Sequence, residues 1–189
     1  MVHAIEAYTS RHRKNPLSDA LAREALRLLS ANLADACRDG QARRPREAML
    51  LGANLAGQAF ANAPVAAVHA LAYPLGGHFH IPHGLSNALM LGPVLSFNMQ
   101  AAAPLYAELH DVVGGTARGG AAERAQGFVD AMEALMNASG APRRLRDAGI
   151  GEESLLMLAA GAMKQTRLLA NNPVEVTEAD ALRLYRQAF

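Results

Sequence analysis

Apolar side chains recur along most of the chain at intervals of three and four residues, the spacing that gathers them on one face of an α-helix. Leu21, Ala25 and Leu28 form such a stripe on a helix expected from about Ser18 to Arg38. Strict alternation of apolar and polar residues, the pattern of a half-buried β-strand, is not sustained anywhere in the sequence. The pattern therefore predicts an all-α domain with a bundle-like arrangement of helices.

Prolines and glycines divide this pattern into separate helices. Pro74 is expected to end one helix at Tyr73, because proline lacks the N–H that continues a helix and restricts the residue before it. Residues 74–84, which hold two prolines and adjacent glycines, are expected to form a loop. The last helix is expected to begin after Thr177, where Asp180 completes a variant of the capping box. The other expected helices cover residues 2–8, 18–38, 45–61, 64–73, 85–97, 104–113, 121–137 and 152–169.

Composition supports helices and narrows the class of protein. Hydrophobic residues make up 51% of the chain, Trp is absent, and the strong helix formers Ala and Leu dominate the apolar residues. The net charge of +1, from 18 basic and 17 acidic residues, does not resemble the basic surface of a nucleic-acid-binding protein. Polar residues interrupt the long apolar stretches, which argues against a membrane span. The single cysteine, Cys37, is expected to be a small buried hydrophobe, and a reducing cytoplasm is the expected location.

Four of the seven histidines lie between positions 69 and 83, and this cluster is the most informative feature of the sequence. His69 is expected on a helix, whereas His78, His80 and His83 are expected in the loop or at its end. A loop that returns through Pro82 to a new helix can bring His83 back beside His69. Imidazoles presented by different elements are suitable ligands for a divalent metal.

His3 is a further candidate ligand, since it also lies on an expected helix and is followed by Glu6 one turn later. The residues alone leave other interpretations open. A single helical histidine is more often a hydrogen-bonded core residue, and a histidine-rich loop can be plain surface. A metallohydrolase is the weakest interpretation, because the sequence has no His-Glu-x-x-His motif.

A long stretch around the histidine cluster carries a specific motif. The runs Gly57–Ala63, Val68–Ala72 and Pro74–Ala88 resemble the signature of the iron-containing (group III) alcohol dehydrogenases. The resemblance covers essentially the whole chain, with further matches at His3–Tyr8, Asn15–Ala20 and Asn172–Pro173.

This resemblance implies a two-domain enzyme, in which an N-terminal α/β domain binds NAD or NADP and a C-terminal helical domain binds a divalent metal, Fe²⁺ or Zn²⁺. Residues 1–189 then form one helical metal-binding domain, and the nucleotide-binding domain is absent from this chain. The family holds its metal with one Asp and three His. His3, His69 and His83 match the histidines, and the Asp would lie two residues before Met1. The implied reaction is hydride transfer between a small alcohol or aldehyde and the nicotinamide, with the metal as Lewis acid.

Tyr73 stands where many family members carry a second histidine close to the nicotinamide, so the resemblance makes it a candidate catalytic and cofactor-contacting residue. Its phenol could donate a proton, and plain packing is the alternative. His78 and His80 are candidates for the wall of the cleft or a proton path, which would give His78 a catalytic role and His80 a cofactor contact. Loop surface is the alternative for both. Phe79 and Phe97 are expected either at the apolar side of the substrate pocket or in the core.

Two kinds of function compete on this sequence. The first is an oxidoreductase fragment, inactive by itself, or a subunit that works with a separate nucleotide-binding chain. The second is a non-catalytic helical remnant that binds metal or a partner. The family resemblance also implies a homodimer, and it leaves a maleylacetate reductase-like substrate open because those enzymes share the fold. No nucleic-acid or membrane partner is expected.

Overall fold

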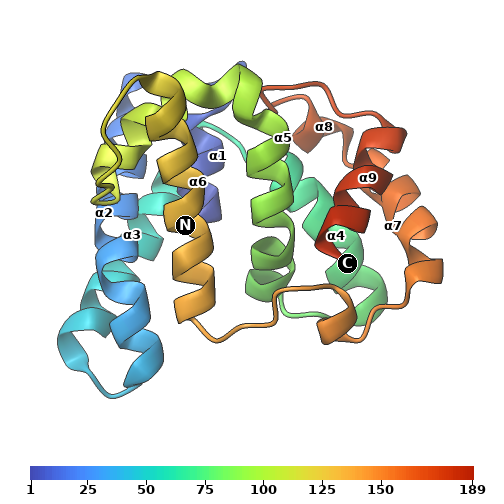
Figure 1. Cartoon of the computed structure of the whole chain (residues 1–189), viewed down its shortest axis with the longest axis horizontal. Coiled ribbons are helices and arrows are strands. Elements are labelled where there is room, and N and C mark those ends of the chain that lie inside the picture. Colours follow the sequence, from blue (N-terminus) through green and yellow to red (C-terminus); the bar gives the residue numbers. More distant parts are fainter.

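The computed structural model describes residues 1–189, and all of its regular elements are helices, which confirms the all-α prediction. The long helix α5 (His83–Val112) runs through the middle of the molecule, with helices packed on both sides of it (Figure 1). One side holds α1 (Val2–Tyr8), α2 (Pro16–Arg38), α3 (Arg43–Asn62) and α6 (Ala121–Ala138). The other holds α4 (Ala67–Phe79), α7 (Leu155–Met163), α8 (Thr166–Leu169) and α9 (Glu178–Ala188), and two 3₁₀ turns, η1 (Arg146–Ala148) and η2 (Glu152–Ser154), precede α7.

Two helices begin at side-chain caps, and α2 begins two residues before the expected start at Ser18. At the start of α2, the Asn15 side chain accepts a hydrogen bond from the Ser18 N–H at 3.0 Å, and Pro16 occupies the first helical turn, where no N–H is needed. At the start of α9, Thr177 and Asp180 form the reciprocal capping box that was predicted. These caps satisfy N–H groups that have no partner within their own helices.

A single apolar core joins the helices. On α5, Met90, Leu95 and Tyr106 are buried, and the Tyr106 ring lies 5.3 Å from the ring of Phe128 on α6. Between α2 and α3 the backbones approach closely, because a Cβ added at Gly52 would lie 3.3 Å from the Ala25 carbonyl oxygen and 2.8 Å from the Leu29 side chain. The core therefore holds α5 against both groups of helices and fixes the positions of the helices that carry the histidines.

The predicted end of the fourth helix at Tyr73 is wrong. Pro74 lies inside α4, which continues to Phe79, so that the expected loop shrinks to the residues just before α5. Pro74 is buried, and a Cβ added at Gly161 of α7 would lie 3.3 Å from the Pro74 ring. Burial of the proline against α7 offsets the hydrogen bond that its missing N–H removes from the helix. His80, with φ of 54° in the left-handed region, ends α4.

Prolines also fail to divide α5. The sequence predicts separate helices over 85–97 and 104–113, yet α5 is continuous over 30 residues with Pro93 and Pro104 inside it. Flanking side chains such as Val94 and Ala102 are buried, so tertiary packing outweighs the local cost of each proline. In the opposite sense, the single helix expected over 152–169 is divided into η2, α7 and α8.

Two further expectations concern the environment of the chain. By length and composition alone, α5 is apolar enough to cross a membrane, a test that a core helix of a water-soluble protein also passes. The prediction that Cys37 is buried is wrong, because this residue lies on an exposed position of α2. The stripe of buried residues on α2 consists of Ala22, Ala25, Leu26 and Leu29, which leaves Cys37 near the exposed end of the helix.

Candidate metal centre

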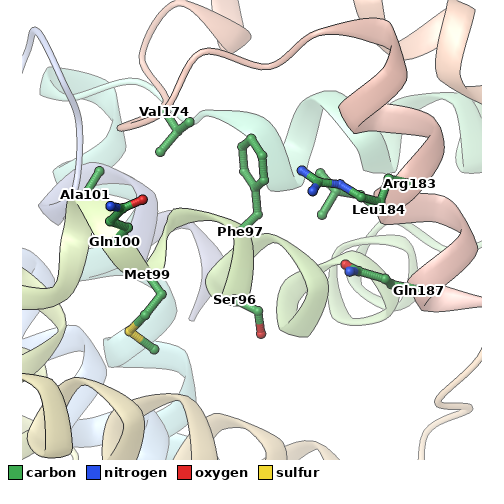
Figure 2. A pocket seen from close by; sticks show the side chains of 9 residues that line it. All are labelled: Ser96, Phe97, Met99, Gln100, Ala101, Val174, Arg183, Leu184 and Gln187. Atoms are coloured by element: carbon green, nitrogen blue, oxygen red, sulfur yellow. The ribbon is translucent and has the colours of Figure 1, made fainter.

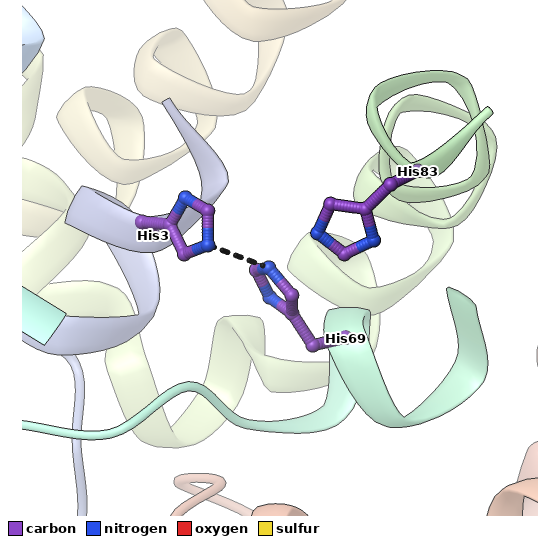
Figure 3. Close-up of side chains that lie close together, drawn as sticks. All are labelled: His3, His69 and His83. Atoms are coloured by element: carbon purple, nitrogen blue, oxygen red, sulfur yellow. Dashed lines mark hydrogen bonds between the residues drawn. The ribbon is translucent and has the colours of Figure 1, made fainter. Parts of the chain in front are cut away.

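Three helices that are distant in the sequence each present one histidine to the same point (Figure 3). His3 comes from α1, His69 from the first turn of α4, and His83 is the first residue of α5. The position of α4 is fixed from outside the helix, since the Asn171 side chain donates to the Val65 carbonyl at 3.2 Å just before its start. The structure therefore brings together the three histidines that the sequence singles out as ligands.

The donor atoms of these histidines are close enough for one small cation. The Nε2 atoms of His3 and His69 lie 3.1 Å apart, and one nitrogen from each of the three residues falls within 4.8 Å of the others. Donors bound tetrahedrally at about 2.0–2.1 Å from a zinc ion would lie roughly 3.3 Å apart. The His3–His69 pair already has this spacing, and His83, whose side chain is exposed, has the freedom to move closer.

A buried carboxylate contacts the ring nitrogen of His69 that faces away from His3. The Oε2 atom of Glu6 lies 2.6 Å from His69 Nδ1, and its Oε1 atom accepts the Val68 N–H at 2.7 Å. Glu6 is only 4% exposed. The sequence places Glu6 one turn after His3, but no role for Glu6 was predicted. Its position on the same helix face as His3 was the only indication that it could lie at the site.

The surroundings of His3 and His83 favour neutral imidazoles. Burial, and then the neighbouring His69, lower the pKa of His3 to about 4. The same two causes lower the pKa of His83. A metal ligand must be unprotonated at the nitrogen that binds, so near neutral pH these two side chains need no proton removed before they can bind.

The walls around the histidines are largely apolar. The three side chains line a cavity of about 390 Å³ together with residues such as Leu29, Met49 and Leu91. The Phe60 ring stacks on His3 with centroids 4.5 Å apart. The cluster therefore lies in a mostly apolar cavity, in which Asn87 is a polar neighbour of His83.

Asn87 lies one helical turn after His83 on α5. Its amide nitrogen is 3.2 Å from a ring nitrogen of His83 and donates to the His83 carbonyl at 2.9 Å. The Oδ1 atom of Asn87 is buried without a hydrogen-bond partner. Asn62, the other asparagine of the signature region, is exposed at the end of α3 and bonds to Gln58 of the same helix.

Tyr73 is adjacent to the cluster, and the other candidates from the same region are not. The Tyr73 ring meets His69 edge-on at 6.5 Å and lies 6.2 Å from the His83 ring, and the residue is 43% exposed. His78, on the last turn of α4, and His80, at its C-cap, are both exposed and belong to no group of metal-ligating side chains.

A second hollow in the surface lies away from the histidines, between α5 and α9 (Figure 2). It has a volume of about 670 Å³, and Phe97 lines it instead of the cavity at the histidine cluster. The guanidinium of Arg183 lies 5.6 Å from the Phe97 ring centre and pairs with Asp180 at 2.8 Å. The one charged group of this hollow thus already has partners within the protein.

A family model described as the C-terminal part of the Fe-containing alcohol dehydrogenase family matches residues 1–189. The chain belongs to the iron-containing alcohol dehydrogenase family. Among curated relatives, long-chain-alcohol dehydrogenase 1 of Geobacillus thermodenitrificans is 41% identical over 190 residues, which cover 100% of this chain and 48% of the relative. The 1,3-propanediol dehydrogenase of Klebsiella pneumoniae is 35% identical, with 100% of this chain and 49% of that protein covered.

Solved structures of the family agree with this assignment. A 1,3-propanediol oxidoreductase matches 100% of this chain and 49% of its own with a TM-score of 0.95 at 35% identity. A maleylacetate reductase from Rhizobium matches 100% of this chain and 49% of its own with a TM-score of 0.81 at 28% identity. The chain thus spans about half the length of the relatives it matches, and the family resemblance of the sequence is confirmed.

Proposed function

We propose that this chain is the metal-binding half of an NAD(P)-dependent oxidoreductase that interconverts alcohols and aldehydes. The single observation that carries the proposal is the convergence of His3, His69 and His83, with two Nε2 atoms 3.1 Å apart. Membership of a family whose relatives are alcohol dehydrogenases supports the reaction class.

In this proposal the three histidines hold Fe²⁺ or Zn²⁺. The bound ion acts as a Lewis acid toward the substrate oxygen. The imidazoles of His3 and His83 supply neutral donors, so these two ligands remove no positive charge from the ion. The apolar walls near Leu29 and Leu91 limit access of water to the buried His69.

Tyr73 is proposed to act at the substrate side of the same centre. Its ring is adjacent to His69 and His83, while its 43% exposure leaves the phenol open to solvent and to a bound molecule. A phenol in this position can donate a hydrogen bond or a proton to the substrate oxygen or contact the nicotinamide. His78 and His80 are proposed as wall residues of the cleft, His78 on a proton path and His80 against the cofactor.

The nucleotide is proposed to bind to an α/β domain outside these 189 residues, in the same polypeptide or in a partner chain. A carboxylate from outside these residues would be the fourth ligand, and the assembly is proposed to be cytoplasmic and dimeric. We expect the 189-residue chain alone to show no NAD(P)-dependent alcohol oxidation.

Two alternatives to this proposed function are kept. The structural match to a maleylacetate reductase makes a substrate of that class the second candidate for the reaction. A non-catalytic helical protein that binds metal or a partner is the candidate if no nucleotide-binding part exists.

The metal centre is tested by calorimetric titration of the metal-free chain with Zn²⁺, and with Fe²⁺ in the absence of oxygen. We expect saturable binding with one ion per chain, which His69→Ala abolishes. His12→Ala is the matched control, since His12 is an exposed histidine outside the cluster. Absence of saturable binding, or binding that survives His69→Ala, would contradict the proposal. Substrates are then compared by assay of alcohol, aldehyde and maleylacetate turnover with a nucleotide-binding partner added.

A further inference from the structure

We infer that Glu6 is a positioning residue that fixes the tautomer of His69, so that the Nε2 lone pair of His69 is free to bind a metal. This inference rests on the proposed metal centre and adds to it a residue outside the ligand set. The reasoning starts from the carboxylate of Glu6, which belongs to α1, and the first turn of α4, which carries His69.

Both oxygens of Glu6 are engaged by this turn. Oε1 accepts the Val68 N–H at 2.7 Å, and Oε2 lies 2.6 Å from His69 Nδ1. The Val68 N–H is one of the groups at a helix start that have no partner within the helix, and Ala66, the N-cap of α4, offers no side-chain acceptor. Glu6 thus caps α4 from another helix, and the positive end of the α4 dipole favours its negative charge.

This arrangement determines where the proton of His69 lies. An ionised carboxylate can only accept hydrogen bonds, so the nitrogen that faces it at 2.6 Å must carry the proton. In a neutral imidazole the second nitrogen then has a free lone pair. That second nitrogen, His69 Nε2, faces His3 Nε2 at 3.1 Å, on the side where the three histidines converge (Figure 3).

Burial and the lack of competing cations make the contact specific. The side chains of His69 and Glu6 are 2% and 5% exposed, so little water competes for the hydrogen bond. No lysine or arginine of the chain lies within ion-pair distance of Glu6, and its only such neighbour is His69. Carboxylates placed in this way behind a metal-binding histidine orient the ring and raise its basicity.

The tautomer is tested directly by ¹⁵N NMR of the metal-free chain labelled at histidine, at a pH above 7. We expect the His69 signals of a ring protonated at Nδ1, assigned by their loss in His69→Ala. A His69 ring protonated at Nε2 in the unsubstituted chain would overturn the inference without any variant of Glu6.

Glu6→Gln gives the second test. The backbone N–H of Val68 can only donate, so the amide oxygen of Gln is expected to face Val68 and its NH₂ group to face His69. His69 must then accept at Nδ1 and carry its proton at Nε2, where it blocks the metal. We expect the NMR signature of His69 to reverse and Zn²⁺ to bind about 10–100-fold more weakly by calorimetry.

The matched control is Glu47→Gln, which removes a carboxylate that is exposed and paired with Arg43 on α3. We expect this variant to bind Zn²⁺ as the unsubstituted chain does. Unchanged Zn²⁺ affinity and an unchanged tautomer in a folded Glu6→Gln variant would overturn the role of Glu6. Failure of the unsubstituted chain to bind Zn²⁺ would instead contradict the proposed metal centre, and the NMR spectrum would still decide the tautomer.

Discussion

A buried hydrogen bond between α9 and α4 offers a quantitative test of how the helix that carries His69 is held. The Tyr185 hydroxyl donates to the Leu71 carbonyl at 2.6 Å, and Tyr185 is fully buried. Burial raises the pKa of Tyr185, so the phenol remains a donor at every pH at which the protein would be studied. Tyr185→Phe removes this hydrogen bond and leaves the ring in place.

The expected cost follows from what remains after the substitution. Within an α-helix the Leu71 carbonyl also faces the N–H four residues later, so the loss of the phenol does not leave it without a partner. The cost is therefore that of an ordinary internal hydrogen bond, about 1 kcal/mol. For a domain of 150–250 residues, 1 kcal/mol corresponds to a fall in Tm of roughly 2–4 °C.

Urea unfolding followed by circular dichroism measures this difference, with Tyr73→Phe as the matched control. Tyr73 lies on the same helix α4 but is 43% exposed, so its variant should unfold within about 0.5 kcal/mol of the unsubstituted chain. Equal stability of the two variants would refute the reasoning that the Tyr185 hydroxyl holds α4 in place. A loss above about 3 kcal/mol for Tyr185→Phe would show that more than one hydrogen bond depends on it.

Four further predictions concern other positions. Thr177→Ala removes the cap of α9 and should cost about 1 kcal/mol in urea unfolding. The hydrogen bond with Thr177 is the main cause that lowers the pKa of Asp180. The ionised Asp180 therefore stabilises the folded state above about pH 4, and this contribution should be lost as the pH falls below that value. Urea unfolding at several pH values would detect the loss. Asn98→Ala removes two hydrogen bonds with the buried Asn172 and leaves the Asn172 Oδ1 atom without a partner, which should cost about 1–3 kcal/mol by the same measurement. His80→Gly relieves a left-handed residue and should raise stability by about 1 kcal/mol, with Zn²⁺ binding unchanged in calorimetry.

Much of the fold could be predicted because local patterns determine it. Apolar spacing identified the helical class, and Thr177 marked a true helix start. The errors fall at Pro74, Pro93 and Pro104, which local rules place at helix ends. Buried residues such as Leu75, Val94 and Ala102 lie close to these prolines in the same helices. The free energy gained by their burial exceeds the cost of a proline inside a helix, and it comes from contacts with residues distant in the sequence.

The candidate site divides in the same way. The family motifs led to His3, His69 and His83, and the structure brings these three residues together. The contact of Glu6 with His69 joins residues 63 positions apart, so the spacing of Glu6 from His3 places it on the same helix face but does not predict this contact. The roles of Tyr73, His78 and His80 remain predictions.

The helix that carries His3 has a consequence for how the proposed metal centre would exchange an ion. Helix α1 carries both His3 and Glu6, so one helix supplies a ligand and the support of a second ligand. Local opening of α1 would therefore withdraw a ligand and the support of a second ligand in one event. An ion at about 100 times its Kd would in turn stabilise the closed form by about 2.7 kcal/mol. Metal exchange and amide hydrogen exchange of α1 should then both depend on the local opening of this helix, so a change that alters one rate should alter the other.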